Sequence, residues 1–116
     1  MKTSEILMNA LDIIDTPGQW TKGAFARKGS VFGPSTLDVN AATCFCSLGA
    51  IRKVSGAALD NGYMRNDALI AEDYLMGATG GAFTAEINDA ASSPFDRKMS
   101  EMWLTAIFCA LADESE

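Results

Sequence analysis

Apolar residues recur at helical spacing near the N-terminus and again in the second half of the chain. This spacing predicts helices over residues 4–14 and 66–77, and a last helix that starts at Ser93, where Ser followed by Pro is a strong helix start. The apolar faces that support these helices are Leu7, Ala10, Leu11 and Ile14; Leu69, Ile70, Tyr74 and Leu75; and Phe95, Met99, Met102, Trp103 and Ala106.

Residues 38–54 are predicted to form a helix that is buried on nearly all sides. Seven of the ten residues from Ala41 to Ala50 are Ala, Cys, Ser or Gly, and most of the others are apolar. A helix that is apolar nearly all round lies in a core. We therefore predict that this helix is the centre of the fold and that Gly49 touches the backbone of another element.

Three stretches show no clear period. Residues 19–29 fit an ordered loop or a short hairpin, pinned by Trp20 and Phe25. Residues 83–89 fit a short helix or a strand equally well. Residues 60–62, with the sequence Asp-Asn-Gly, are predicted to form a turn.

Together these elements predict a mainly α fold. The expected architecture is a compact bundle of four to five helices around the buried helix 38–54, formed by a single helical domain over residues 1–116. A variant with a small hairpin near residues 20–28 stays open as the alternative.

The net charge of the chain limits the kinds of partner that it is expected to bind. It carries 9 Lys and Arg against 15 Asp and Glu, a net charge of −6, of which residues 1–56 contribute +2 and residues 57–116 contribute −8. We expect no nucleic-acid partner, since phosphate contacts need Lys and Arg. No apolar run reaches the roughly 18 residues that a membrane span needs, and the N-terminus lacks a signal-peptide core. The sequence therefore predicts a cytoplasmic protein without a membrane partner.

The sequence lacks residue types that several kinds of catalytic and metal-binding site need. Histidine is absent, which removes Ser-His-Asp and Cys-His nucleophile pairs and the usual general base near neutral pH. Cys44, Cys46 and Cys109 are too few and too widely spread for a zinc site, and are predicted to be buried free thiols. The sequence favours a protein that is not an enzyme, with no catalytic residues, no metal and no cofactor.

Five residues remain as candidates for a polar binding site: Trp20, Lys22, Arg27, Asn88 and Asp89. Trp and Arg are enriched at binding hot spots, and Lys22 and Arg27 supply positive charge. The alternative interpretation is structural, with Trp20 covering the core and Arg27 paired to Asp89 as an internal brace. We predict that Arg27 and Asp89 interact.

The last helix carries a second apolar row, Leu104, Phe108 and Leu111, at i, i+4, i+7 spacing on the side opposite its first face. One helix cannot bury both sides against a single layer. The row therefore predicts an interface with a protein partner or with another copy, and we favour a homodimer.

Three motifs together resemble a family of short uncharacterised phage and bacterial proteins. They are W-T-K-G-A-F-A-R at residues 20–27, C-S-L-G-A-I at 46–51 and N-D at 88–89, against a family pattern of W-T-x-G-x-x-A-R, C-x-x-G-A-[IL] and N-D. The resemblance implies a phage or prophage origin and action in the host cytosol. Small acidic proteins of that origin often bind a host protein, including defence machinery such as CRISPR complexes.

Two classes of function follow. The first is a small acidic, non-catalytic binding protein that acts on a host protein. The second is a small-ligand or enzymatic domain built on the five candidate residues. Convergence of those side chains on one open pocket would favour the second, and their burial as internal braces would favour the first.

Overall fold

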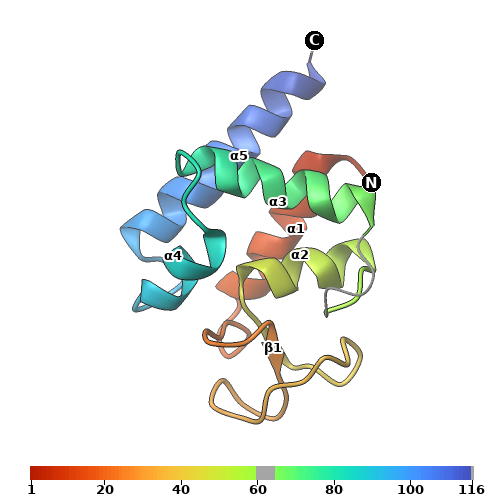
Figure 1. The fold of residues 1–116 in the computed structure, drawn as a ribbon, viewed down its shortest axis with the longest axis vertical. Coiled ribbons are helices and arrows are strands. Elements are labelled where there is room, and N and C mark those ends of the chain that lie inside the picture. Colours follow the sequence, from red (N-terminus) through yellow and green to blue (C-terminus); the bar gives the residue numbers. More distant parts are fainter. Residues whose placement is uncertain (60–64, 116) are drawn as a thin grey trace.

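The computed structural model describes residues 1–59 and 65–115 (Figure 1). It contains α1 (Thr3–Asp15), β1 (Ala26–Arg27), β2 (Cys44–Phe45), α2 (Ser47–Ser55), α3 (Asn66–Ala78), α4 (Thr84–Ala90) and α5 (Arg97–Glu114). The prediction of a mainly α fold is confirmed. Of residues 83–89, left open between helix and strand, Phe83 is the N-cap and the others fall in α4, while the predicted turn at residues 60–62 lies outside the described residues.

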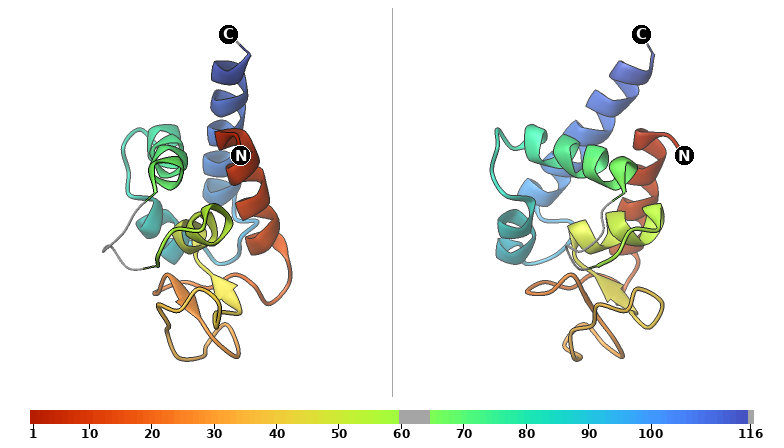
Figure 2. Two further views of the ribbon diagram at one scale, coloured as in Figure 1. Left: turned by 90° about the vertical axis from the view of Figure 1, so that its right-hand side faces the viewer. Right: turned by 45° about the vertical axis from the view of Figure 1, so that its right-hand side comes forward.

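The helices pack around a common apolar core. α1 lies against α2 and α5, and α3 lies against α5 and α2. The stripe predicted for the first helix is confirmed, since Leu7, Ala10 and Ile14 are fully buried on α1. The segment between α1 and α2, residues 16–46, forms a loop lobe at one end of the molecule, and the C-terminal end of α5 projects from the other end (Figures 1 and 2).

The buried helix predicted over residues 38–54 begins only at Ser47. Three backbone N–H groups just before it donate to residues 19–27 instead of to a preceding helical turn. Those bonds join Thr43 to Arg27, Phe45 to Gln19 and Cys46 to Phe25, at 2.9, 2.8 and 3.1 Å. Residues 38–42 form a single turn, in which the N–H groups of Ala41 and Ala42 donate to the carbonyl oxygen of Asp38. Cys46 is therefore the N-cap of α2.

The predicted hairpin near residues 20–28 is present only in part. That segment supplies β1, but the antiparallel partner of β1 is β2, with Ala26 opposite Phe45 and Arg27 opposite Cys44. Phe45 also forms an isolated parallel bridge with Trp20. The loop lobe is therefore fixed to the strand that leads directly into α2.

Two helices differ from the sequence prediction in detail. α5 begins after an N-cap at Asp96, because Ser93 forms a separate turn in which its Oγ accepts from Phe95 N at 3.2 Å, and Phe95 stays 66% exposed. On α3 the predicted face is rotated: the helix buries Ala68, Ala71 and Leu75, and leaves Leu69 and Ile70 exposed.

Candidate functional site

The side chain of Asn88, on α4, connects three separate segments. It is fully buried. Its Oδ1 accepts hydrogen bonds from Trp20 Nε1 at 2.9 Å, from Ser47 N at 3.0 Å and from Ser47 Oγ at 2.8 Å, while its Nδ2 donates to Thr21 O at 3.1 Å. Because the indole and backbone N–H groups can only donate, they fix which end of the amide is the oxygen. Asn88 thereby links the loop lobe to the first residue of α2.

The residues that follow Trp20 are held by the C-terminal end of α4. Lys22 Nζ donates to Ala91 O at 2.9 Å, and Gly23 N donates to Asp89 Oδ1 at 2.9 Å. Both charged side chains therefore bind backbone groups of the opposite segment. Together with Asn88 they fasten residues 20–23 to α4.

Arg27 braces the loop lobe internally. Its Nε donates to Thr21 Oγ1 at 3.1 Å, and its two terminal nitrogens donate to the carbonyl oxygens of Gly33 and Lys22 at 3.0 and 3.1 Å. The predicted contact between Arg27 and Asp89 is wrong: no ion pair in the described part of the chain joins them. The side chains of Arg27 and Asp89 instead form hydrogen bonds with backbone groups of residues 21–33.

The five predicted site residues thus meet in one region, between the loop lobe and α4, where hydrogen bonds engage their polar atoms as braces. Sequence reasoning missed Thr21 and Ser47, which belong to the same network. Both are buried polar residues within the W-T and C-S-L-G motifs. A polar residue inside an otherwise apolar motif was the signal that could have indicated them.

α2 approaches the loop lobe closely at Gly49. A Cβ added there would lie 2.0 Å from the carbonyl oxygen of Phe25 and 2.9 Å from its carbonyl carbon. The predicted contact between Gly49 and the backbone of another element is therefore present. The same carbonyl accepts the N–H of Cys46 at 3.1 Å, which holds the two segments in register.

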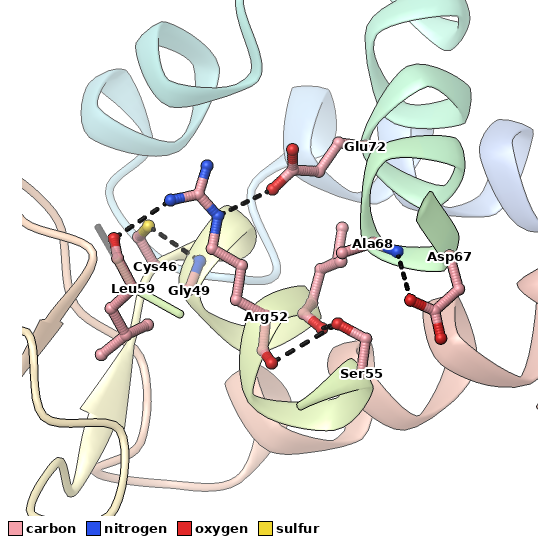
Figure 3. A network of polar contacts seen from close by, with 9 residues as sticks. Cys46, Gly49, Arg52, Ser55, Leu59, Asp67, Ala68 and Glu72 are labelled. Atoms are coloured by element: carbon pink, nitrogen blue, oxygen red, sulfur yellow. Dashed lines mark hydrogen bonds and ion pairs between the residues drawn. The ribbon is translucent and has the colours of Figure 1, made fainter. Parts of the chain in front are cut away.

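A second polar network, shown in Figure 3, joins α2 to α3. The side chain of Arg52 is buried; its Nε pairs with Glu72 at 3.0 Å, its Nη1 donates to Leu59 O at 3.0 Å, and its guanidinium lies 4.2 Å from the ring centroid of Phe25. Burial raises the pKa of Glu72, and the charge of Arg52 opposes that rise only in part. The pair joins α2 to α3, and a buried ion pair is by itself weak evidence for added stability.

The three cysteines differ in accessibility. Cys44 and Cys46 are buried, but Cys109 is exposed, so the prediction that all three are buried is wrong for Cys109. Burial also raises the pKa of the Cys46 thiol, and the N–H groups at the start of α2 oppose this only partly. Since the thiolate is the reactive form, Cys109 is the accessible thiol of the native protein.

One thiol per chain is therefore expected to react rapidly with a thiol reagent in the native protein, and three after unfolding in urea. Counting labelled thiols by mass spectrometry at short times measures this. Cys109→Ser should abolish the rapid reaction, whereas Cys44→Ser should leave it unchanged. Rapid labelling of the Cys109→Ser protein would contradict the burial of the other two thiols.

Three of the five candidate residues also line an open cavity of about 380 Å³ on the loop lobe: Trp20, Lys22 and Arg27. Phe32, which is 93% exposed, and Val31 complete its apolar side. The candidate residues are thus internal braces that also present a concave surface.

The second apolar row lies exposed on α5. Leu104, Phe108 and Leu111 are 49%, 66% and 41% exposed, while the first face of the helix is buried from Met99 to Ala110. The N-terminal end of α5 carries the exposed pair Arg97 and Glu101, at 2.9 Å.

In residues 1–59 and 65–115, no three His, Cys, Asp or Glu side chains are grouped so that they could hold a metal ion. Of the helices described there, none combines the length and the apolar character required to cross a membrane.

Fold and site define a mainly α protein whose loop lobe is fastened to the helices by buried polar side chains. The chain belongs to a family of unknown function, DUF6197, whose model matches residues 1–103. The predicted membership of an uncharacterised family is confirmed, while the match leaves the specific motif pattern untested. No curated protein and no solved structure matches the chain. The five candidate residues lie inside the matched region, and the row from Leu104 to Leu111 follows it.

Proposed function

We propose that this protein is a small, non-catalytic binding protein whose α5 row docks onto a protein surface. The observation that carries the proposal is the exposure of Leu104, Phe108 and Leu111 in one line on a helix whose other face is already buried. Removing apolar surface from water is worth about 25 cal/mol per Å², and contiguous exposed apolar surface marks interaction sites. Each of the five candidate residues, in contrast, makes at least one internal hydrogen bond.

A second copy of the chain suits the row by its spacing. Leu104, Phe108 and Leu111 are separated by four and three residues, the heptad spacing of a coiled-coil seam. The same spacing continued towards the N-terminus reaches Glu101 and Arg97, which are charged, so the apolar seam is short. In an antiparallel pair, Leu104 of each copy packs against Phe108 of the other. Glu101 then lies against Leu111 on either side of that centre.

The charges on α5 favour the same antiparallel arrangement. Asp113 and Glu114 make the C-terminal end of the helix acidic, whereas at the N-terminal end Arg97 and Lys98 are balanced by Asp96 and Glu101. Parallel pairing would bring the two acidic ends together, and antiparallel pairing keeps them apart. Such charge effects set orientation more than affinity.

The wild-type protein is expected to sediment as a dimer at micromolar concentration, and Phe108→Glu should raise the dimer dissociation constant by at least about tenfold, because a symmetric interface loses the contact twice. Phe108 is 66% exposed, so the change should leave the fold of each chain intact, and the far-ultraviolet circular dichroism of the variant should match that of the wild type. Leu69→Glu, at a 42% exposed apolar residue of α3, is the matched control and should remain dimeric. A wild-type monomer, or equal effects of both variants, would contradict the dimer.

The family resemblance gives the proposal its finer form, in which the protein acts in the host cytosol and the dimer, whose α5 rows are covered, uses its acidic surface to bind a host protein, such as a component of defence machinery. The net charge of −6 suits a partner with a basic surface. A pull-down from host lysate tests this form. Recovery of the same protein from a reaction with an unrelated acidic bait would count against it.

A further inference from the structure

We infer that the cavity beside Trp20 is a binding site for a small organic anion, an acidic group attached to a flat apolar body. This site is separate from the α5 row and does not depend on the binding function proposed for it. The cavity is lined by Lys22 and Arg27 and by no carboxylate, in a chain that is acidic as a whole. The two cations are therefore not neutralised at the cavity surface.

The charge of the loop lobe supports this assignment. Residues 16–46 hold three basic residues and one acidic residue, Asp38, which gives +2, and the rest of the chain holds six and fourteen, which gives −8. A positive region on a negative molecule attracts a small anion. The acidic remainder repels a long polyanion, so the expected ligand is a small molecule rather than a nucleic acid.

Both cations are held in place and keep donors for a ligand. Arg27 uses three of the five N–H groups of its guanidinium on Thr21, Gly33 and Lys22, and Lys22 uses one of its three on Ala91. These internal bonds restrict the motion of both side chains. A ligand therefore meets donors that are already ordered, which lowers the entropy cost of binding.

The apolar side of the cavity indicates the rest of the ligand. Trp20 and Phe32 both line it, and Phe32 is 93% exposed although it is a large aromatic residue. Aromatic side chains favour stacking against a flat ring. The volume of about 380 Å³ is at the small end of ligand sites, and suits a single ring with an acidic group.

Phenyl phosphate, with inorganic phosphate and benzyl alcohol as its two halves, tests the site by NMR titration. The indole N–H of Trp20 should shift saturably with phenyl phosphate, which should bind at least tenfold more tightly than either half. Phe32→Ser, at a residue too exposed to affect folding, should weaken phenyl phosphate at least threefold and leave inorganic phosphate unchanged.

Two lysines of the loop lobe provide the charge test. Lys22→Gln should weaken phenyl phosphate at least fivefold, whereas Lys28→Gln, at an exposed lysine that does not line the cavity, should change affinity less than twofold. The melting temperature of the Lys22→Gln protein is measured first. If that variant does not fold, the Phe32→Ser variant provides the test of the site. Absence of saturable shifts at millimolar phenyl phosphate, or equal losses from both lysine variants, would overturn the inference.

Discussion

Replacing Asn88 with Ala is expected to lower the free energy of unfolding by about 3–5 kcal/mol. The substitution removes the acceptor of Trp20 Nε1 and of Ser47 N, and the donor to Thr21 O, at a fully buried position. Each buried polar group left without a partner costs about 1–3 kcal/mol. The loss is large because a single amide serves all of these groups.

Urea denaturation of the wild type and the variant measures this difference. Asn9→Ala is the matched control, since Asn9 is an exposed residue of α1 whose side chain donates a long hydrogen bond to Met1 Sδ, at 3.7 Å. That change should alter stability by no more than about 0.5 kcal/mol. If the Asn88→Ala protein stays within about 1 kcal/mol of the wild type, Asn88 does not connect the lobe to the helices as described.

Gly49→Ala is expected to destabilise the protein by at least about 2 kcal/mol. The new methyl group would lie 2.0 Å from the carbonyl oxygen of Phe25, and a backbone atom cannot turn away as a flexible side chain could. The loss comes despite the gain of about 1 kcal/mol that Ala has over Gly within a helix. Displacement of α2 from the loop lobe is the expected structural response.

Gly77→Ala, the same chemical change at another helical glycine, is expected to stabilise the protein rather than destabilise it. Gly77 lies in α3, has no positive φ, and an added Cβ would meet nothing within 4 Å. That variant should be more stable than the wild type by up to about 1 kcal/mol, since only helix propensity acts. Thermal melts of both variants decide the matter: a loss at Gly77, or none at Gly49, would be inconsistent with this packing.

The spacing of apolar residues predicted a helix well where one face of that helix packs against other helices. α1 matches its stripe because Leu7 and Ile14 meet the core in the way that helical spacing demands. The start of α2 could not be predicted locally, since Ala41 and Ala42 favour a helix. Tertiary hydrogen bonds from residues 43–46 to residues 19–27 outweigh that preference.

Composition and motif brought the five candidate residues to attention, and the fold does bring them together. Their partners could not be predicted, because most of them are backbone groups: Ala91 O for Lys22, Gly23 N for Asp89. Charge pairing alone suggested Arg27 with Asp89, and backbone geometry decided otherwise. The burial of Arg52 was missed for a related reason, since an arginine near a helix end is usually exposed.

Trp20 has a double position, as a wall of the cavity and as a donor to Asn88. An indole released from Asn88 would no longer form this wall of the cavity. If the cavity binds the small anion inferred above, a ligand that does not bind the unfolded chain stabilises the folded one by RT ln(1 + [L]/Kd). Binding at the cavity and the attachment of the loop lobe to α4 are then coupled through one side chain.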